Sequence, residues 1–523
     1  ADRLEAVAAA GSASGAGTGG GRAVVFVGFM GAGKSSAARS VAAPLGQQPL
    51  DSDHELERAL GESIESFFDR EGEAEFRRRE EQLVVDLLGR PDVRVLALGG
   101  GAVESSRVRD ALERHVVVHL EVGSDAAWRR ASGKGRPLAR DRANFDALHA
   151  DRRALYESVA DATIPAADRG VALRALPALL RLPEAPAGTR LVWAPAASGE
   201  YPVFVGSGLL RGDFFHPLEG RRFAVSDTNV APLHAVRSDW AARIPPGESE
   251  KTLARAEEVL RAMARAGVGH DDLVAAVGGG VVGDLAGFCA AVYQRGIRHV
   301  QVPTTLVAQV DSAYGGKTAV DLPEGKNYVG AYRQPAAVLV DPSALETLPA
   351  AEAAAGYAEV VKTALIAGGE LWARVRDGRD PDRAVVIGCL RTKLTVVAED
   401  ERDEGRRQVL NLGHTVGHAI EAATRYGRYR HGEAVGLGLM CALRLSGREP
   451  LRAEVGRLLA ARGLPLRADG VDPDAVVDLV GRDKKRRGDR VPFVLVESPG
   501  RVTAGHDVDE QDLRAAVAEV CGA

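Results

Sequence analysis

The sequence predicts a multidomain α/β protein whose C-terminal part is helical. Short apolar runs alternate with helical stretches in two separate parts of the chain, which is typical of parallel sheets covered by helices. Several of these runs end in glycine-rich turns. Beyond Leu345 the strand signals nearly vanish, and helical patterns continue to about Arg482. At roughly 100–200 residues per domain, a chain of 523 residues predicts two to four domains.

Composition and charge exclude several classes of protein. The chain is 45% hydrophobic and 27% charged, which excludes disorder along its whole length. Its 67 basic and 72 acidic side chains give a net charge of −5, so neither nucleic acid nor an anionic membrane is a predicted partner. The four cysteines lie far apart, which indicates neither a disulfide framework nor a thiolate zinc site. No apolar run approaches the ~18–20 residues of a membrane span and no leader pattern is present, so we expect a cytoplasmic location.

The first part of the chain reads as a tail followed by one α/β domain. Residues 1–22 are rich in Gly, Ser and Ala and predict a disordered tail. The domain is expected over 23–182, with strands at 23–27, 93–98 and 116–120 and helices at 34–45, 55–60, 74–88 and 146–159.

The stretch 183–199, rich in Pro, Ala and Gly, is the best candidate for a linker, which we place at 183–189. A second α/β domain is expected over 190–345 and a helical domain over 346–523. The second sheet is expected from strands at 223–226, 273–277, 299–302 and 337–340.

A phosphate-binding loop is the first motif that carries chemistry. The string GFMGAGKS at 28–35 fits G-x-x-x-x-G-K-[ST], follows an expected strand and opens an expected helix. In such a loop, backbone N–H groups at Gly31 and Gly33 wrap phosphate oxygens. Lys34 reaches the β- and γ-phosphates, and Ser35 ligates Mg²⁺. The alternative is an ordinary glycine-rich turn without a ligand, and the match at all four fixed positions of the motif argues against it.

Four further features lie downstream of this loop, and each also has a structural explanation. Asp51 and Asp53 can hold Mg²⁺ or accept a hydroxyl proton, although such a pair is more often a turn or a helix cap. The three arginines at 77–79 alone predict a solvated helix face, and the three glycines at 99–101 a tight turn. The string GKGRP at 133–137 is typical of a mobile loop bearing a cation.

Together these residues resemble shikimate kinase over 23–182, through GFMGAGKS, LDSD, EGEAEFRRRE, LALGGGAV, GRPL and RRALY. The resemblance implies a P-loop kinase domain with a parallel sheet, in which Lys34, Asp53 and Arg136 are catalytic and Ser35 and Asp51 position Mg²⁺. It implies ATP binding by Gly31, Gly33, Lys34, Ser35, Ser36, Arg130 and Arg136. It implies shikimate binding by Asp53, Arg77, Gly100, Gly101 and Arg152, where the register favours Arg152 over the adjacent Arg153.

The second part of the chain carries another glycine-rich turn. The string GGGVVG at 278–283 satisfies G-x-G-x-x-G and follows an apolar strand. Asp284 begins a helical stretch on which a pyrophosphate could rest, and Thr304 and Thr305 follow the next strand. The acid usually found ~20 residues downstream is missing, so an ordinary Rossmann domain fits poorly.

A cluster of histidines predicts a metal site. His414 and His418 are four residues apart and share one side of an expected helix, and His431 follows in HGEAV. A carboxylate would complete the site, and Glu359 in GYAEVVK is one candidate among several. Spacing alone does not choose between His418 and His431 as the second nitrogen ligand.

From about Arg190 to the C-terminus the chain resembles 3-dehydroquinate synthase. The matching strings include PPGESEKT, GGGVVGDLAGFCAAVYQRG, VPTTLVAQVDSAYGGKTAVD, GKNYVGAY, NLGHTVGHAIE and RDKKRRG. The resemblance implies an NAD-binding α/β domain followed by an all-helical metal-binding domain, with Glu359, His414 and His431 as ligands of Zn²⁺ (or Co²⁺). His418 then becomes a proton-handling residue, so the spacing argument for a 414/418 ligand pair is wrong in part.

The resemblance also implies the rest of this site. NAD⁺ would be bound by Asp227, Glu248, Lys251, Gly279, Gly280, Val281, Asp284, Thr304, Thr305, Asp311, Lys317 and Lys326. The substrate, 3-deoxy-D-arabino-heptulosonate 7-phosphate, would be bound by Asp311, Lys317, Asn327, Lys362, Lys393, Arg407, Asn411, His418 and Lys485 of the Lys484–Lys485 pair. Lys317, His418, Lys362 and Arg295 would be catalytic, with Arg295 reaching across a homodimer.

The expected function is a bifunctional enzyme of aromatic amino-acid biosynthesis. It would phosphorylate shikimate with ATP and Mg²⁺, and make 3-dehydroquinate and phosphate with NAD⁺ and a metal. The alternatives for the second half are a related sugar-phosphate cyclase or a polyol dehydrogenase. Another alternative is that one half is an inactive scaffolding module.

Overall fold

The computed structural model describes residues 22–132, 137–166, 168–211, 214, 220–234, 236–481 and 491–522. These residues form two compact units, which we describe separately. The first runs to Trp193 and includes Pro202–Phe204, and the second comprises Ala194–Tyr201 and Val205–Ala523.

A parallel sheet forms the centre of the first unit. Its strands follow the order β2–β3–β1–β4–β5–β6. Val24 of β1 lies opposite Val95 of β3 and Val116 of β4, and all four residues of β1 are buried. The strands are β1 (Val24–Val27), β2 (Pro49–Asp51), β3 (Val95–Ala97), β4 (Val116–Glu121), β5 (Ala162–Pro165) and β6 (Arg190–Ala194).

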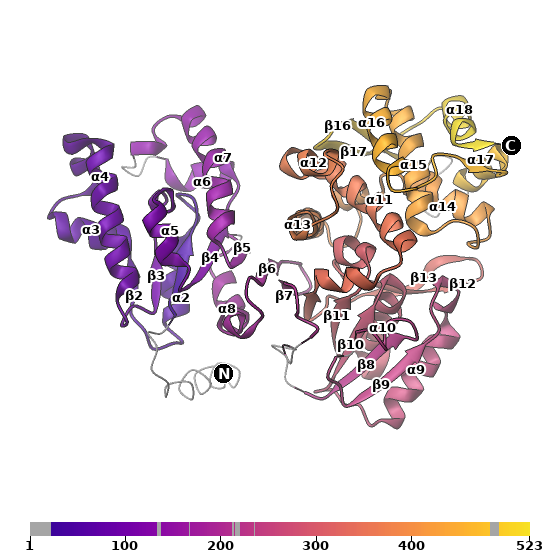
Figure 1. The fold of residues 1–523 in the computed structure, drawn as a ribbon, viewed down its shortest axis with the longest axis horizontal. Coiled ribbons are helices and arrows are strands. Elements are labelled where there is room, and N and C mark those ends of the chain that lie inside the picture. Colours follow the sequence, from indigo (N-terminus) through magenta and orange to yellow (C-terminus); the bar gives the residue numbers. More distant parts are fainter. Residues whose placement is uncertain are drawn as a thin grey trace. The chain divides into compact units, whose positions relative to one another are not determined.

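Helices cover the sheet of the first unit (Figure 1). They are α2 (Lys34–Ala42), α3 (Ser52–Leu60), α4 (Ile64–Gly89), α5 (Ser106–Leu112), α6 (Ser124–Ala131), α7 (Arg142–Val159) and α8 (Val171–Arg181), with the 3-10 turns η1 (Ala102–Glu104) and η2 (Pro137–Ala139). The α4 helix is broken at Gly72, whose φ of 81° is left-handed, so the expected helix at 74–88 corresponds to its second part.

The stretch expected to be a linker is partly ordered structure. It contains the turn η3 (Leu182–Glu184) and the strand β6, which pairs in parallel with β5 through Leu191 and Ala162. Leu191 is completely buried. The Pro, Ala and Gly content of 183–199 hid this strand, because its apolar core is only three residues long. The strand begins directly after the linker placed at 183–189, and β7 (Tyr201–Val205) is the next strand.

The second unit begins with another parallel sheet, of order β14–β11–β10–β8–β9. Its strands are β8 (Arg222–Asp227), β9 (Trp240–Ile244), β10 (Leu273–Gly278), β11 (Arg298–Pro303) and β14 (Ala337–Val340). The helices α9 (Leu253–Arg265) and α10 (Gly280–Val292) pack against it over a core that includes Val259, Met263, Val274 and Leu285. A hairpin of β12 (Lys317–Leu322) and β13 (Gly325–Tyr332) adjoins α10.

Helices build the rest of the second unit, as the sequence predicts, and Figure 1 shows them gathered at one end of its sheet. They are α11 (Ala350–Ala367), α12 (Gly369–Arg376), α13 (Arg383–Glu399), α14 (His414–Ala423), α15 (His431–Leu445), α16 (Glu449–Ala460), α17 (Pro473–Gly481) and α18 (Glu510–Val520). Two small sheets accompany them, the hairpin of β16 (Phe493–Ser498) and β17 (Arg501–His506) and the short pair β15 (Ala468–Asp469) and β18 (Cys521–Gly522).

No helix among the described residues is long and apolar enough to cross a membrane. The four cysteines are free and buried, in agreement with the expected lack of a disulfide framework.

Candidate active sites

The phosphate-binding loop connects β1 to α2, the context that the motif requires. Gly28, Gly31 and Gly33 have φ angles of 142°, 82° and 93°, which side chains other than glycine rarely adopt. A Cβ atom at Gly31 would lie 2.7 Å from the carbonyl oxygen of Ala127. Lys34 Nζ donates to the carbonyl of Gly28 at 2.9 Å, so its ammonium group lies over the loop. Ser35 and Ser36 lie in the first turn of α2.

The two expected acids lie at the carboxyl end of β2. Asp51 caps α3, and its carboxylate accepts a hydrogen bond from the backbone N–H of Asp53 at 3.0 Å. Asp53 lies against the glycine turn, since a Cβ at Gly99 would be 2.5 Å from its Oδ1. The same Cβ would be 2.6 Å from Glu80 Oε1, so a second carboxylate shares this place. Burial raises the pKa of Glu80 despite the nearby Arg77 guanidinium.

Two arginines from different helices meet beside these acids. Arg77 of α4 lies 2.5 Å from Glu80 Oε2, and Arg152 of α7 is only 3% exposed. Both also contact Glu104, at 3.6 Å from Arg77 Nε and 2.7 Å from Arg152 Nε. The structure thus brings Arg152 to the place that the sequence register favours, whereas Arg153 is exposed.

The glycine turn lies directly against the Arg77 guanidinium. A Cβ at Gly101 would be 2.1 Å from Arg77 Nη1, and Tyr156 donates to the Gly100 carbonyl at 2.5 Å. Arg130 extends from α6 toward the phosphate-binding loop and lies 3.4 Å from the Gly31 carbonyl. The expected Arg136 lies outside the described residues.

In the second unit, the glycine turn at the end of β10 opens α10. Asp284 of α10 pairs with Lys251 at 3.1 Å, and Lys251 also contacts Glu248 at 3.1 Å. Burial raises the pKa of Asp284 although Lys251 opposes this shift. Thr304 Oγ1 is buried and has no hydrogen-bond partner among the described residues. A polar surface therefore surrounds the N-terminus of α10.

The remaining residues expected at the nucleotide occupy nearby turns and strands of the second unit. Asp227 ends β8 and accepts hydrogen bonds from the backbone N–H groups of Asn229 and Val230 at 2.8 Å each. Gly279, Gly280 and Val281 begin α10, and Thr305 follows β11.

Three helices bring Glu359, His414 and His431 together. Glu359 Oε1 lies 3.6 Å from His414 Nε2 and 3.4 Å from His431 Nε2. This oxygen is buried and accepts no hydrogen bond from a described residue. His414 Nδ1 lies 3.1 Å from the carbonyl of Leu412, so a proton on Nδ1 leaves the Nε2 lone pair directed at the carboxylate. The arrangement fits a divalent cation of the zinc type.

His418 belongs to a second possible ligand set, with Glu421 and His431. Glu421 Oε1, however, already accepts a hydrogen bond from Lys326 at 2.9 Å, which reduces its capacity to bind a cation. The His418 ring lies 5.3 Å from the His414 ring and 5.9 Å from the His431 ring. The His414 ring lies 5.3 Å from the His431 ring too, so the preference for His431 rests on the Glu359–His414–His431 group, whose ligand atoms all lie within 4.8 Å of one another.

The protonation of the two facing histidines differs. Burial, then the Lys362 ammonium, lowers the pKa of His414 to about 3, so this imidazole is neutral. Burial lowers the pKa of His431 as well, but the carboxylates of Glu359 and Glu421 outweigh burial and raise it to about 10. A bound cation would take the place of the His431 proton between these carboxylates.

Cations and one acid line the space beside the metal-binding cluster. Asp311 lies in the π-helical turn η6 (Ala308–Ser312), 3.0 Å from Lys362 Nζ and in contact with Lys393. Burial would raise the pKa of Asp311, but these two ammonium groups lower it to about 2. Lys317 pairs with Asp403 at 2.5 Å.

Arg407 and Asn411 lie in the turn η8 (Arg406–Asn411). Arg407 is 2% exposed and donates to the carbonyls of Glu401 at 2.6 Å and Gly315 at 3.0 Å. Asn411 Nδ2 donates to the Gln408 carbonyl at 3.1 Å. Asn327, in the β12–β13 hairpin, has a φ of 58°.

Arg295 is exposed at the end of the turn η5 (Tyr293–Arg295). The Lys484–Lys485 pair lies outside the described residues. Arg295 and its neighbour Gln294 both have left-handed backbones, with φ of 70° and 49°.

Sequence reasoning missed the carboxylates that contact the expected residues. Glu80, Glu104 and Glu421 have no role in the sequence prediction, although each contacts residues that do. Glu421 could have been found, because it is three residues after His418 and seven after His414, on one face of α14. Glu104 could not, because only the folded chain brings it to Arg77 and Arg152.

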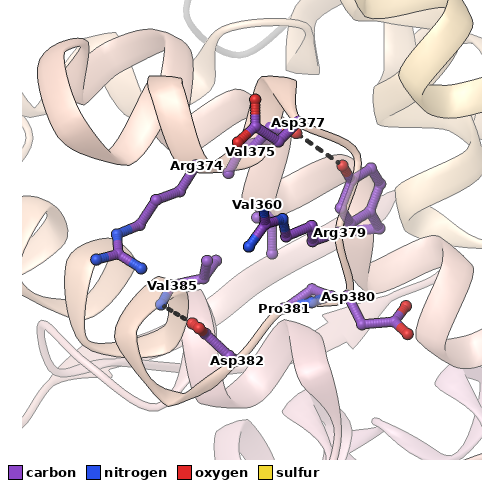
Figure 2. Close-up of a pocket in the computed structure, with 10 residues that line it drawn as sticks. Val360, Arg374, Val375, Asp377, Arg379, Asp380, Pro381, Asp382 and Val385 are labelled. Carbon is purple, nitrogen blue, oxygen red and sulfur yellow. Dashed lines mark hydrogen bonds between the residues drawn. The ribbon is translucent and has the colours of Figure 1, made fainter.

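A small cavity of about 60 Å³ lies apart from these clusters (Figure 2). It is formed where α11, α12 and α13 meet, and Tyr357 and Val360 of α11 form its wall. None of the residues that line it is an expected site residue.

Comparisons with family models divide the chain in the same order. Residues 30–176 match shikimate kinase, residues 241–355 match the N-terminal part of 3-dehydroquinate synthase, and residues 356–486 match its C-terminal part. The 3-dehydroquinate synthase of Halorhodospira halophila is 43% identical over 333 residues, which is 60% of this chain and 94% of that protein. That of Symbiobacterium thermophilum is 42% identical over 347 residues, 60% of this chain and 96% of that protein.

Solved structures similar to this chain include two other synthases. A 2-deoxy-scyllo-inosose synthase, in complex with carbaglucose-6-phosphate, NAD⁺ and Co²⁺, is 26% identical with a TM-score of 0.56, over 63% of this chain and 99% of that one. ValA, a 2-epi-5-epi-valiolone synthase from Streptomyces hygroscopicus with bound NAD⁺ and Zn²⁺, is 27% identical with a TM-score of 0.55, over 61% of this chain and 95% of that one.

Proposed function

The chain belongs to the 3-dehydroquinate synthase family and carries a shikimate kinase domain ahead of the synthase part. From this premise we propose which residues carry out each of its two reactions. It is a bifunctional enzyme of the shikimate pathway. One reaction transfers phosphate from ATP to shikimate. The other converts 3-deoxy-D-arabino-heptulosonate 7-phosphate to 3-dehydroquinate and phosphate.

In the kinase site, the backbone N–H groups of the phosphate-binding loop hold the phosphates of ATP. Lys34 exchanges its contact with the Gly28 carbonyl for the β- and γ-phosphates. Arg130, which already borders the loop, lies against the adenine, and Arg136 covers the phosphates. Ser35 and Asp51 hold Mg²⁺, which offsets the negative charge of the transferred group.

Shikimate binds on the other side of the loop. Arg77 and Arg152 hold its carboxylate, because planar guanidinium groups match a carboxylate with two parallel hydrogen bonds. Asp53 contacts the hydroxyls and takes the proton of the hydroxyl that attacks the γ-phosphate. Gly100 and Gly101 let the ring approach the backbone, since any side chain at Gly101 would collide with Arg77.

In the synthase site, the N-terminus of α10 would hold the pyrophosphate of NAD⁺. The other residues that would hold it are those named from the resemblance. Among them, the buried Thr304 hydroxyl has no hydrogen-bond partner among the described residues, and Lys251 contacts both Glu248 and Asp284. When bound, NAD⁺ would supply reversible hydride transfer at the substrate alcohol.

Glu359, His414 and His431 hold the metal, which is Zn²⁺ or Co²⁺. Support comes from Glu359 Oε1, a buried carboxylate oxygen without a hydrogen bond that faces two imidazole nitrogens. The metal supplies polarisation of the substrate oxygen.

The surrounding side chains orient the substrate and handle its protons. Asp311 accepts a hydrogen bond from a substrate hydroxyl, since its lowered pKa keeps it ionised. Lys362 and Lys393 neutralise its charge and that of the ligand. His418, which has no place in the favoured ligand set, can take and return a proton near the leaving phosphate. The remaining contacts to the phosphate and carboxylate come from Lys317, Asn327, Arg407, Asn411 and Lys485.

A homodimer through the synthase part is supported by Arg295. Its consecutive left-handed backbone and exposure suit a residue held in position for another chain. Val292, close by at the end of α10, is 43% exposed, which leaves an apolar side chain for a partner to cover. Light scattering after size-exclusion chromatography tests this proposal, and a monomer that retains full synthase activity would refute it.

The observation that carries the synthase assignment is the Glu359–His414–His431 cluster. The variants His414→Ala and His418→Ala give a matched test, since the two histidines lie on one helix and differ in proposed role. The first should lose bound metal and synthase activity. The second should keep its metal and lose most of its rate. Full metal occupancy in His414→Ala contradicts the ligand assignment.

A related sugar-phosphate cyclase is the second candidate for this half, because the two similar structures are those of other synthases. Sequence identity favours the synthase, at 43% against 26% and 27%. A polyol dehydrogenase would instead accumulate NADH. Synthase activity with the heptulosonate phosphate, and none with hexose or heptulose phosphates that lack a carboxylate, separates these cases.

A further inference from the structure

Glu104 lies inside the proposed shikimate site, and the roles above leave it out. It is the last residue of η1, the turn that follows Gly101, and its backbone N–H donates to the Gly101 carbonyl at 2.9 Å. Arg109 Nη1 donates to the carbonyls of Val103 and Glu104 at 2.8 Å each. The backbone of Glu104 is therefore held in place, and only its side chain can change its contacts.

The Glu104 carboxylate bridges the two arginines of the proposed clamp. Its Oε1 accepts a hydrogen bond from Arg152 Nε at 2.7 Å, and its Oε2 lies 3.6 Å from Arg77 Nε. Arg77 Nε is buried and donates to no described residue, so it keeps a donor for a better-placed acceptor. A carboxylate thus already stands between the two guanidinium groups, where a substrate carboxylate is expected.

The three side chains differ in how easily they can leave. Arg152 is almost fully buried, and Arg77 is tied to the buried Glu80 at 2.5 Å. The Glu104 side chain is 37% exposed and reaches both arginines from the rim of the site. A carboxylate at the rim can be rehydrated on rotation toward solvent, whereas a buried guanidinium cannot. Glu104 is therefore the side chain of the three that we expect to rotate away when a ligand enters.

We propose that Glu104 is an intramolecular competitor for the carboxylate clamp, so that shikimate binds by displacing it. The proposal rests on the proposed function, since it takes Arg77 and Arg152 as the groups that hold the substrate carboxylate. Two carboxylates cannot share the clamp without repulsion, so each binding event includes the release of Glu104. The competition weakens shikimate binding relative to an empty clamp.

The test is the dissociation constant of shikimate for the full chain, measured by titration calorimetry without ATP. Glu104→Gln should lower this constant about 3- to 5-fold, the upper part of the range expected for loss of a partly exposed ion pair. Glu73→Gln is the matched control, because Glu73 lies 3.4 Å from Arg77 and does not bridge to Arg152. It should change binding by no more than about twofold.

A second ligand distinguishes displacement from a general effect on the site. Methyl shikimate carries no negative carboxylate, so Glu104→Gln should leave its binding unchanged while it tightens that of shikimate. Glu104→Ala should shift shikimate binding in the same direction as Glu104→Gln.

Each outcome decides the matter. Unchanged or weaker shikimate binding in both Glu104 variants overturns the proposal and makes Glu104 a support for the arginines. The proposal is also overturned if Glu73→Gln tightens shikimate binding as much as Glu104→Gln does, or if Glu104→Gln tightens the binding of methyl shikimate equally. Either result would indicate a general effect of charge. Arg152→Ala tests the underlying assignment of the clamp separately. Unchanged shikimate binding in that variant would show that the clamp itself is assigned wrongly.

Discussion

At the scale of single residues, the metal-binding cluster depends on a carboxylate outside the proposed ligand set. His431 lies between two acids, with Nε2 3.4 Å from Glu359 and Nδ1 3.5 Å from Glu421. Lys326, expected at the nucleotide, holds Glu421 at 2.9 Å. A carboxylate on the second nitrogen of a ligating histidine fixes the orientation of its ring. Glu421 thus connects the nucleotide side of the site to the metal side.

Replacing Glu421 by glutamine should weaken metal binding. We expect a loss of about 10- to 100-fold in affinity, the usual effect of removing such an outer contact. Competition with a chromophoric chelator measures this affinity directly. Glu352→Gln, on the exposed first turn of α11, is the control and should bind metal like the wild type. Unaltered affinity in Glu421→Gln would contradict the role of this residue.

Motifs in the sequence named most residues of both proposed sites but not the carboxylates that contact them. Lys34, Glu359 and His414 stand in short strings whose spacing or family resemblance indicates their chemistry. Glu80 and Glu104 reach the arginines through a helix face and a loop that meet only in the folded chain. Spacing alone left the choice between His418 and His431 open, and the family resemblance is what indicated His431 as the ligand.

At the scale of elements, the close crossing of α14 and α15 places the two histidines. A Cβ added at Gly438 of α15 would lie 1.8 Å from the carbonyl oxygen of Gly413, just before α14. At Gly417 of α14 it would lie 3.0 Å from the Ala434 carbonyl. Glycines therefore let the backbones of these helices approach closely, which brings His414 and His431 within 3.6 Å and 3.4 Å of one carboxylate oxygen.

Gly438→Ala should push the two helices apart. We expect a loss of about 1–3 kcal/mol of stability, typical of overpacking, together with weaker metal binding. Gly436→Ala in the same helix is a matched control, because its nearest atom would be 3.6 Å away, an ordinary contact. Thermal unfolding of the two variants gives the comparison. Equal melting temperatures would show that the contact at Gly438 is relieved without cost.

Elements with a strong apolar run were predictable, and weakly patterned ones were not. The expected strands at 223–226, 273–277, 299–302 and 337–340 correspond to β8, β10, β11 and β14. The hairpin strand β13 was missed, because its glycines and half-exposed residues show no alternation. The strand β6 was missed because prolines and glycines on either side suggested a linker.

At the scale of the whole molecule, the chain is two enzymes in series. Their steps are not consecutive in the pathway, so direct transfer of a product between them does not explain the fusion. The proposed sites draw on residues of one compact unit each. The two activities should therefore fail independently.

Lys34→Ala tests this independence. It should reduce kinase activity by about 10³-fold or more, since it removes the ammonium group that is proposed to stabilise the negative charge of the transferred phosphate. Synthase activity should stay near the wild-type value. Both rates are measured on one preparation, and a parallel loss of synthase activity would mean that the two units are coupled.

The central claim is tested most directly by one paired assay on the purified chain. One reaction mixture contains shikimate and ATP, and the other contains 3-deoxy-D-arabino-heptulosonate 7-phosphate, NAD⁺ and the metal. The account predicts shikimate phosphorylation in the first and phosphate release with no net rise in NADH absorbance in the second. Accumulation of NADH, or no phosphate release, would contradict the synthase assignment, and no shikimate phosphorylation would contradict the kinase assignment.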